Sequence, residues 1–234
     1  MLFNQTLQPA ILLRRYRRFL ADVELSNGEA LTVHCPNTGS MLGCSTPGSP
    51  VMISRAANPE RKYPHTLEMV EVDGGWVGVN TSRTNKLVRE ALENGIFPEL
   101  EPFDEIRAEV KTGRSRLDFL LGNGREMTYL EVKNCTLARD GVARFPDAVT
   151  ARGTKHLREL LTLREQGYRA ALIFCVQLGN ISHFAPAAQI DPLYAATLSE
   201  VADKGVMILA CRAEVSPTGI VADKRLPVRC RDGQ

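Results

Sequence analysis

Three acidic side chains and a lysine fall on three consecutive stretches of the chain that have the composition of strands. Glu109 comes first, Asp118 follows it, and Glu131 and Lys133 come after a glycine-rich turn. Because side chains alternate along a strand, Glu131 and Lys133 share one face. Carboxylates at facing positions destabilise a sheet, by up to about 1 kcal/mol. A cluster of them therefore indicates a bound cation.

The turns decide how closely these side chains approach one another. A two-residue turn at residues 113–114 places Glu109 opposite Asp118. Across the next turn, a four-residue loop sets Asp118 opposite Glu131, whereas a two-residue loop makes them diagonal neighbours. In either case we expect all four charged side chains on one face of three adjacent strands.

Mg²⁺ (or Mn²⁺) fits such a site, because it is a hard ion that prefers oxygen ligands and keeps several waters. Asp118, Glu131 and Glu109 are the predicted metal ligands. Lys133 is placed to orient a metal-bound water or to stabilise charge on a phosphate. These four residues are the predicted catalytic set for phosphodiester hydrolysis. The alternative is a solvated sheet face, because D…E-x-K is a short pattern with many chance matches.

The elements around this motif follow the order α-β-β-β-α-β, and a further α-β pair comes after them. Apolar residues at helical spacing and Gly stop signals mark the helices, and apolar runs mark the strands. Helices are expected at 81–95, 149–167 and 191–205, and strands at 106–111, 116–121, 128–133, 168–178 and 206–213. The charged motif therefore falls on strands of one α/β domain.

The first eighty residues have a different character and read as all-β. Apolar residues alternate over 19–25, and Asn27-Gly28 supplies a hairpin turn, with a second hairpin around 73–75. Short strands separated by Gly and Pro turns predict a small barrel or sandwich. We therefore predict two domains, residues 1–80 and residues 81–234, in an α+β / α/β fold class.

Three basic segments make DNA the expected partner, because arginines neutralise phosphates and aromatic rings stack on bases. For the first segment, the alternative is an edge strand kept soluble by its charge. The predicted nucleic-acid-binding residues are Arg14, Arg15, Arg17 and Arg18 in the first segment, Arg61 and Lys62 in the second, and Arg152, Lys155 and His156 on the expected second helix.

The composition excludes several classes of protein. With 234 residues, 44% of them hydrophobic, the chain can bury a core, and its net charge of +2 is only mildly basic. The six cysteines form no CxxC pair, so a zinc site is not expected. No apolar run reaches the roughly 20 residues that cross a bilayer. We expect a cytoplasmic protein without a membrane partner; its oligomeric state stays open, a homodimer included.

Several longer segments resemble one family. RYRRFLADV, HCPNTGSMLGC, RKYPHT, VNT, SRLDFLL, YLEVKNCTL and FPDAVTARGTKHLREL, in this order, resemble the bacterial sugar fermentation stimulation protein A family. The resemblance implies an N-terminal OB-like β-barrel followed by a PD-(D/E)XK restriction-endonuclease-like αβββαβ domain. It also implies sequence-nonspecific DNA binding and a link to sugar (maltose) metabolism genes.

The nuclease motif of that fold carries over to individual residues. Asp118 takes the place of the nuclease Asp, Glu131 the acidic position, Lys133 the lysine, and Glu109 the upstream acidic residue. Leu117 stands where a proline is often found. The absence of this proline does not change which residues are implied as metal ligands.

Two functions are compatible with these residues. The first is a Mg²⁺-dependent nuclease whose barrel grips DNA, single- or double-stranded, while Asp118 and Glu131 hold the ion. The second is a catalytically silent DNA-binding regulator of sugar (maltose) metabolism genes. The intact D…E-x-K set favours the nuclease, because a protein that only binds DNA gains nothing from carboxylates beside its phosphate groove.

Overall fold

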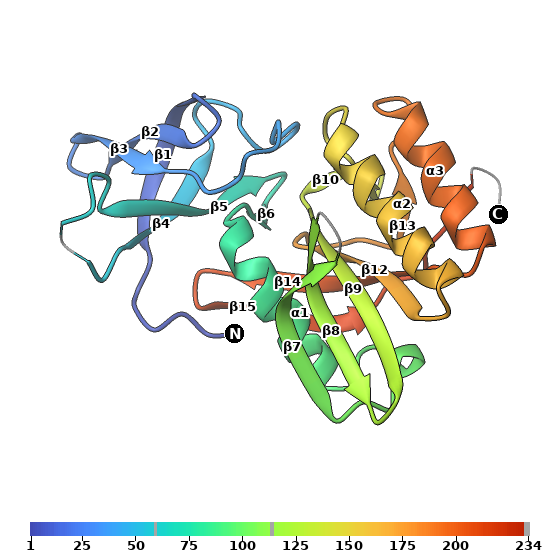
Figure 1. The fold of residues 1–234 in the computed structure, drawn as a ribbon. Helices are drawn as coiled ribbons and strands as arrows, with labels where there is room; N and C mark the ends of the chain where they lie inside the picture. The colour runs from blue at the N-terminus through green and yellow to red at the C-terminus, as the bar shows by residue number, and fades with distance from the viewer. Residues whose placement is uncertain (59, 113–114, 232–234) are drawn as a thin grey trace.

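Six short strands build the N-terminal domain of the computed structural model, which describes residues 1–58, 60–112 and 115–231. They are β1 (Gln8–Tyr16), β2 (Leu20–Leu25), β3 (Ala30–His34), β4 (Pro50–Arg55), β5 (His65–Val72) and β6 (Gly75–Gly78). The sheet order is β3-β2-β1-β4-β5-β6, and a bridge between His34 and Thr66 joins β3 to β5. This bridge closes the sheet, so the expected small β-barrel is confirmed (Figure 1).

Tight turns with positive φ shape the barrel. Both expected hairpins are present, and Asp73-Gly74 between β5 and β6 has φ values of 50° and 75°, which suits a right-handed strand twist. A third such turn, at Arg17-Arg18, joins β1 to β2 with φ values of 49° and 63°. Strand β1 lies between β2 and β4, but β4 pairs only with residues 8–11, so the basic segment from Arg14 onward has a strand partner, β2, on one side. The alternative of a charged edge therefore stays open for this segment.

A six-stranded sheet forms the centre of the second domain. Its strands are β7 (Glu105–Thr112), β8 (Ser115–Asn123), β9 (Glu126–Cys135), β12 (Arg169–Val176), β14 (Met207–Ser216) and β15 (Gly219–Arg225), and its helices are α1 (Thr84–Glu93), α2 (Ala151–Glu165) and α3 (Pro192–Asp203). The order is β15-β14-β12-β9-β8-β7, and β12 runs parallel to both of its neighbours. The expected α-β-β-β-α-β order is therefore confirmed. None of the helices in the described part of the chain is long and apolar enough to cross a membrane.

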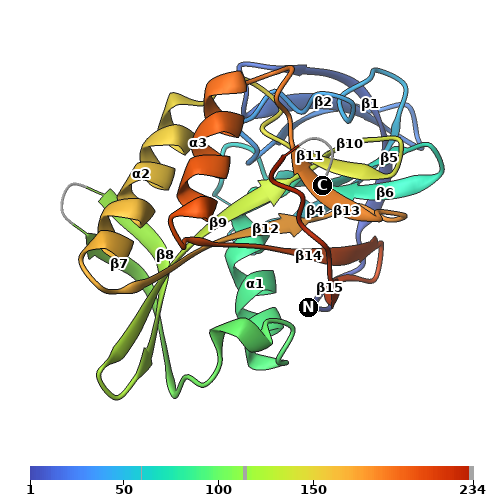
Figure 2. The same ribbon diagram turned by 90° about the vertical axis from the view of Figure 1, so that its right-hand side faces the viewer.

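Helices cover both faces of this sheet, with α1 on one face and α2 and α3 on the other (Figure 2). Strand β12 shows the consequence in its sequence. Ile173 and Cys175 pack with the side chains of α1, and Leu172 and Phe174 pack with those of α2 and α3. A strand buried on both faces needs a continuous apolar run, as ALIFCV provides.

The shortest elements were not predicted from the sequence. They are the 3₁₀ turns η1 (Thr81–Arg83) and η2 (Pro98–Leu100) and the small sheet β10-β11-β13, formed by β10 (Leu137–Arg139), β11 (Val142–Phe145) and β13 (His183–Pro186). Strands of three or four residues are too short to show alternation. The last strand, β15, was also missed.

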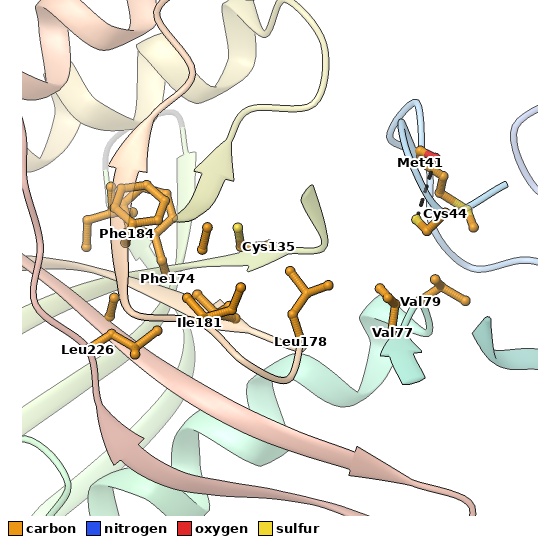
Figure 3. Close-up of a cluster of buried hydrophobic side chains, with 14 of the residues drawn as sticks. Met41, Cys44, Val77, Val79, Cys135, Phe174, Leu178, Ile181, Phe184 and Leu226 are labelled. Atoms are coloured by element: carbon orange, nitrogen blue, oxygen red, sulfur yellow. Dashed lines mark hydrogen bonds between the residues drawn. The ribbon is translucent and has the colours of Figure 1, made fainter. Parts of the chain in front are cut away.

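One hydrophobic core continues from the barrel into the second domain. Val77 and Val79, at the end of the barrel, lie toward Leu178 and Ile181, in the loop after β12 (Figure 3). All four side chains are at most 9% exposed. The two domains therefore share buried surface instead of meeting only through polar contacts.

A close backbone approach fixes this junction. The N–H of Gly78 donates to the carbonyl oxygen of Gln177 at 3.1 Å, and a Cβ at Gly78 would lie 2.2 Å from Gln177 Oε1. Gln177 is fully buried, and its Nε2 donates to Asn134 Oδ1 at 2.5 Å and to Thr84 Oγ1 at 3.2 Å. Only glycine lets β6 come this close to the end of β12.

Candidate metal centre and the adjoining cleft

Strands β8 and β9 separate at the predicted site. Their pairing runs from the turn to Phe119↔Leu130, the last pair of the ladder. Continued by one step, this register sets Asp118 opposite Glu131. The turn between Asn123 and Glu126 has two residues, the length for which diagonal neighbours were expected, so the expected link between loop length and register is wrong. The pairing ends at that step, so the two carboxylates meet where the sheet opens.

Two donors hold the Asp118 carboxylate in this opening. Oδ2 accepts the backbone N–H of Val132 at 2.8 Å, and Oδ1 accepts the side-chain amide of Asn85, on α1, also at 2.8 Å. Burial and the negative charge of Glu131 raise the pKa of Asp118, against the lowering effect of these hydrogen bonds and of Lys133. The raised pKa reflects two carboxylates close together in a buried place.

Glu131 is 3% exposed and lies beneath α2. Its Oε1 accepts from Lys133 Nζ at 2.5 Å and also contacts Nδ1 of His156. Lys133 Nζ lies 3.2 Å from the same ring nitrogen. Burial favours a higher pKa for Glu131, but the hydrogen bond with His156 and the charge of Lys133 outweigh it, and the pKa is lowered. Glu131 is therefore an anion with two basic groups gathered at one oxygen.

Glu109 does not join this group, so the expected convergence of three carboxylates is not found. The pairs on either side, Ala108↔Phe119 and Val110↔Leu117, keep the expected register, but Glu109 itself has a φ of 55°. This left-handed backbone interrupts the strand. The Glu109 side chain is 67% exposed and pairs with Arg116 at 3.1 Å. Residues 113–114, where the turn was expected, lie outside the described residues.

A cleft of about 560 Å³ opens between the two domains next to these residues. Asn134, which follows Lys133 in β9, lines it together with Thr150 and Arg152 at the start of α2. The barrel contributes the loop 37–40 and Arg18. In Figure 1 this barrel loop faces the beginning of α2. The cleft therefore begins one residue along β9 from the acidic site.

The barrel loop that lines the cleft is fixed to the second domain. Ser40 Oγ donates to the carbonyl oxygen of Asp147 at 2.6 Å, and the N–H of Met41 donates to Asp147 Oδ2 at 2.8 Å. At the other end of the loop, Thr81 Oγ1 donates to the carbonyl oxygen of Pro36 at 2.9 Å. The walls of the cleft are thus tied to one another on both sides.

Arg15, predicted to contact nucleic acid, supports this loop from within the barrel. Its guanidinium donates at 2.7–3.1 Å to four backbone carbonyl oxygens, those of Arg18, Asn37, Gly39 and Ser40. Most of its donors are therefore used to shape the loop, although the side chain lines the cleft.

The other three arginines of the first basic segment differ in their contacts and in their exposure. Arg14 Nε donates to Asp22 Oδ2 at 2.7 Å, so its charge is paired within the barrel. Arg17 and Arg18 form the turn between β1 and β2 and are exposed. Of the four, Arg18 reaches the cleft with its side chain available.

Of the remaining residues predicted to bind nucleic acid, one lines the cleft and the others lie elsewhere. Arg61 lies 3.2 Å from His34, and Lys62 lies over the ring of Tyr63, in a loop at the left edge of Figure 1, away from the second domain. On α2, Arg152 lines the cleft, whereas Lys155 pairs with Glu159 at 3.5 Å and His156 is buried against Glu131. His156 therefore lies at the acidic site and not on the surface where it was expected to contact DNA.

Sequence reasoning missed Asn85 and Asp147, which position Asp118 and the barrel loop. Both lie in polar segments at the start of a helix, where such residues usually serve as caps. The available signal was the number of polar residues in TSRTN and FPDAVT, since Thr150 alone caps α2 and leaves Asp147 without a role in the helix.

A closed OB-like barrel followed by an α/β domain, with an acidic pair and a lysine where two strands diverge, defines a two-domain protein of the restriction-endonuclease-like fold class. Residues 13–79 match the family model described as the SfsA N-terminal OB domain, and residues 82–219 match the sugar fermentation stimulation protein RE domain. The chain therefore belongs to the sugar fermentation stimulation protein family, as the sequence segments predicted.

Relatives of full length agree with this assignment. The sugar fermentation stimulation protein homolog of Geotalea uraniireducens is 53% identical over 222 residues, which cover 94% of this chain and 96% of the relative. That of a Geobacter species is 52% identical over 225 residues, or 96% and 97% of the two chains. A solved structure of Pyrococcus furiosus SfsA in complex with Ca²⁺ matches with a TM-score of 0.89 and 30% identity, over 98% of each chain.

Proposed function

We propose that this protein binds DNA and hydrolyses phosphodiester bonds with the help of a divalent metal ion, Mg²⁺ or Mn²⁺. The observation that carries the proposal is the placement of Asp118 opposite Glu131 where β8 and β9 diverge, with Lys133 held by Glu131. The match of residues 82–219 to an RE domain supports it, because the matched range contains Asp118, Glu131 and Lys133.

Asp118 and Glu131 would hold the metal ion. Their oxygens are the hard ligands that Mg²⁺ prefers, and an ion that keeps several waters needs only one or two carboxylates. The pair fits a cation on its own geometry, because two basic groups already gather at Glu131 and the two carboxylates lie close together where β8 and β9 diverge. Nowhere in the described ranges does a group of three or more His, Cys, Asp or Glu converge as a metal site. The Ca²⁺ complex of the Pyrococcus furiosus relative is further support for a divalent ion.

The chain's own residues would supply orientation and charge. When bound, a divalent ion neutralises phosphate charge and lowers the pKa of a coordinated water. Lys133, held 2.5 Å from Glu131, would stabilise negative charge that develops on the phosphate oxygens. Asn85 and the Val132 N–H keep the Asp118 carboxylate in one orientation. In the hydrolysis, a water oxygen forms a new bond to phosphorus, one P–O ester bond breaks, and a proton of the water ends on the leaving oxygen, so one end carries a phosphate and the other a hydroxyl.

Exposed arginines support DNA as the substrate. Within the described part of the chain, the guanidinium groups of Arg17, Arg18 and Arg152 make no hydrogen bond or ion pair. Such groups are available to neutralise phosphates, which gives most of the affinity of nonspecific DNA binding. They are the residues of the predicted DNA-binding set that we retain for this role.

The test is cleavage of labelled single- and double-stranded DNA during a titration of Mg²⁺ or Mn²⁺. We expect metal-dependent cleavage by the wild type and a loss of about 100-fold or more in Lys133→Ala, because a charged group aimed at the phosphate is removed. The matched control is Lys204→Ala, since Lys204 is an exposed lysine on α3 that pairs with Glu200 at 2.6 Å. It should cleave at the rate of the wild type.

DNA binding without cleavage at every metal concentration would contradict the nuclease. It would favour the alternative, a catalytically silent DNA-binding regulator of sugar (maltose) metabolism genes. A protein that neither binds nor cleaves DNA would contradict both functions.

A further inference from the structure

The cleft beside the acidic site has walls of two chemical kinds. Arg18 and Arg152 bring positive charge to it from the barrel and from α2. Leu137, Phe145 and Val149 bring apolar surface, and Val149 is 76% exposed. Because these three apolar side chains line the same cleft as the two arginines, the cleft fits a ligand with both anionic and apolar parts.

The local structure does not explain the charge of Arg152. It lies in the first turn of α2, which contains no acidic residue. Positive charge is unfavourable there, because the beginning of a helix is the positive end of its dipole. Arg152 therefore costs the helix a little stability, and an anion in the cleft would offset that cost.

The size of the cleft restricts the ligand. About 560 Å³ is the volume of a pocket for one small molecule, comparable to one or a few nucleotides. The contacts of Asp147 with Ser40 and Met41 on one side, and of Thr81 with Pro36 on the other, resist widening. A duplex needs far more space than this volume offers, and its base faces are already stacked on one another.

We propose that this cleft binds single-stranded DNA and leads the strand to Asp118 and Glu131. Phosphates lie on Arg18 and Arg152, and an unstacked base lies on the apolar surface around Val149. Proteins that bind single strands combine a positive groove with apolar or aromatic faces in this way. The inference rests on the proposed DNA binding and adds the strand preference of the same site.

The experiment measures binding in EDTA, so that it does not depend on cleavage. A short labelled oligonucleotide, single-stranded or as a duplex of the same sequence, is titrated with protein and followed by fluorescence anisotropy over a range of salt concentrations. The variants are the double variant Arg18→Gln/Arg152→Gln and the single variant Val149→Ser. The matched controls are Arg125→Gln, in the exposed turn at the far end of β8 and β9, and Val221→Ser, an exposed valine on β15.

We expect the wild type to bind the single strand more tightly than the duplex. The double variant should lose about tenfold in single-strand affinity, and its salt slope should fall by about 1.4, because each lost phosphate contact on a single strand removes about 0.7. Val149→Ser should lose about threefold, with an unchanged salt slope, because it removes base contact and no charge. The controls should match the wild type.

Equal affinity for single strand and duplex, with both reduced alike in the double variant, would overturn the inference. So would a Val149→Ser variant that behaves as Val221→Ser. Metal-dependent cleavage of duplex DNA would still support the proposed nuclease in those cases. Conversely, tight single-strand binding that Arg18 and Arg152 control, without cleavage in Mg²⁺, would contradict only the nuclease.

Discussion

The acidic site of β8 and β9 and the arginine-rich hairpin of β1 and β2 both concentrate charge, but they manage it differently. In the acidic site, Asp118 and Glu131 have the same sign and are largely buried near each other. In the hairpin, Arg14 and Arg15 are each provided with acceptors from the barrel itself. One region keeps a repulsion that the other avoids.

This difference separates a binding site from a structural feature. Arg14 and Asp22 have opposite signs, so their pairing stabilises the barrel and leaves no net charge for a ligand. Like charges held together below the surface destabilise the free protein unless something else compensates. Lys133 and His156 pair with Glu131, but burial and the charge of Glu131 still raise the pKa of Asp118. The repulsion that remains at Asp118, more than the number of charges, identifies the acidic site as the place where a cation is expected.

The strongest test of this comparison is within the acidic set. Asp118→Asn should reduce cleavage by about 100-fold or more, because it removes a metal ligand. In the absence of metal, its affinity for DNA should equal or exceed that of the wild type, since one negative charge is gone. Cleavage and anisotropy assays measure the two effects.

The matched control is Glu109→Gln, which also removes one negative charge from the same three strands. Its carboxylate is exposed and paired with Arg116, so cleavage should change little. Equal losses in the two variants would show that Glu109 joins the site, contrary to the structure. A collapse of DNA affinity in Asp118→Asn would show that Asp118 is mainly structural.

The second test is within the hairpin. Arg15→Gln should lower the free energy of unfolding by about 1–3 kcal/mol, because carbonyl oxygens of the cleft loop lose a charged donor. Arg17→Gln, in the exposed turn, should change it by no more than about 0.5 kcal/mol. Denaturant unfolding measures both. Similar values for the two variants would contradict the structural role given to Arg15.

The smallest effect concerns acid stability. Burial raises the pKa of Asp22, but hydrogen bonds from Thr32, Arg14 and Tyr16 outweigh it, and the pKa lies below the ordinary value of 3.8. As the pH falls, the unfolded chain therefore binds this proton before the folded protein does. The stabilisation from ionised Asp22 is complete above the ordinary value and is lost as the pH falls through the lower pKa of the folded protein.

Asp22→Asn should remove this contribution, of less than about 1 kcal/mol for a pair at the surface. When thermal unfolding is measured from neutral to acidic pH, the midpoint temperature should fall less steeply in acid for Asp22→Asn than for the wild type. Glu24→Gln, an exposed carboxylate on the same strand, is the matched control. A midpoint that falls as steeply for Asp22→Asn as for the wild type would contradict the stabilising role given to Asp22.

Much of the fold could be predicted because its signals are local and periodic. Apolar alternation, Asn-Gly and Asp-Gly turns and helix stop signals gave the barrel and the α-β-β-β-α-β order. The placement of Glu131 and Lys133 on one face also follows from strand geometry alone. Glu109 was misplaced because a single left-handed φ, which no periodic pattern reveals, turns its side chain away.

The cleft could not be predicted because it is made by long-range contacts. Asp147 and Met41 are more than 100 positions apart in the sequence, and the donors of Arg15 are used by a loop more than 20 residues away. Composition showed that arginines were clustered, but it did not show which of them the barrel would use. That depends on which carbonyl oxygens the folded loop presents.

The core shared by Val77, Val79, Leu178 and Ile181 limits how this protein can be divided or recombined. A fragment that ends near residue 80 would present the two valines to water, and self-association is the common fate of such an apolar patch. A barrel transplanted from a relative would need the matching loop after β12 and a glycine at position 78. The two domains are therefore expected to be inherited and engineered as one unit.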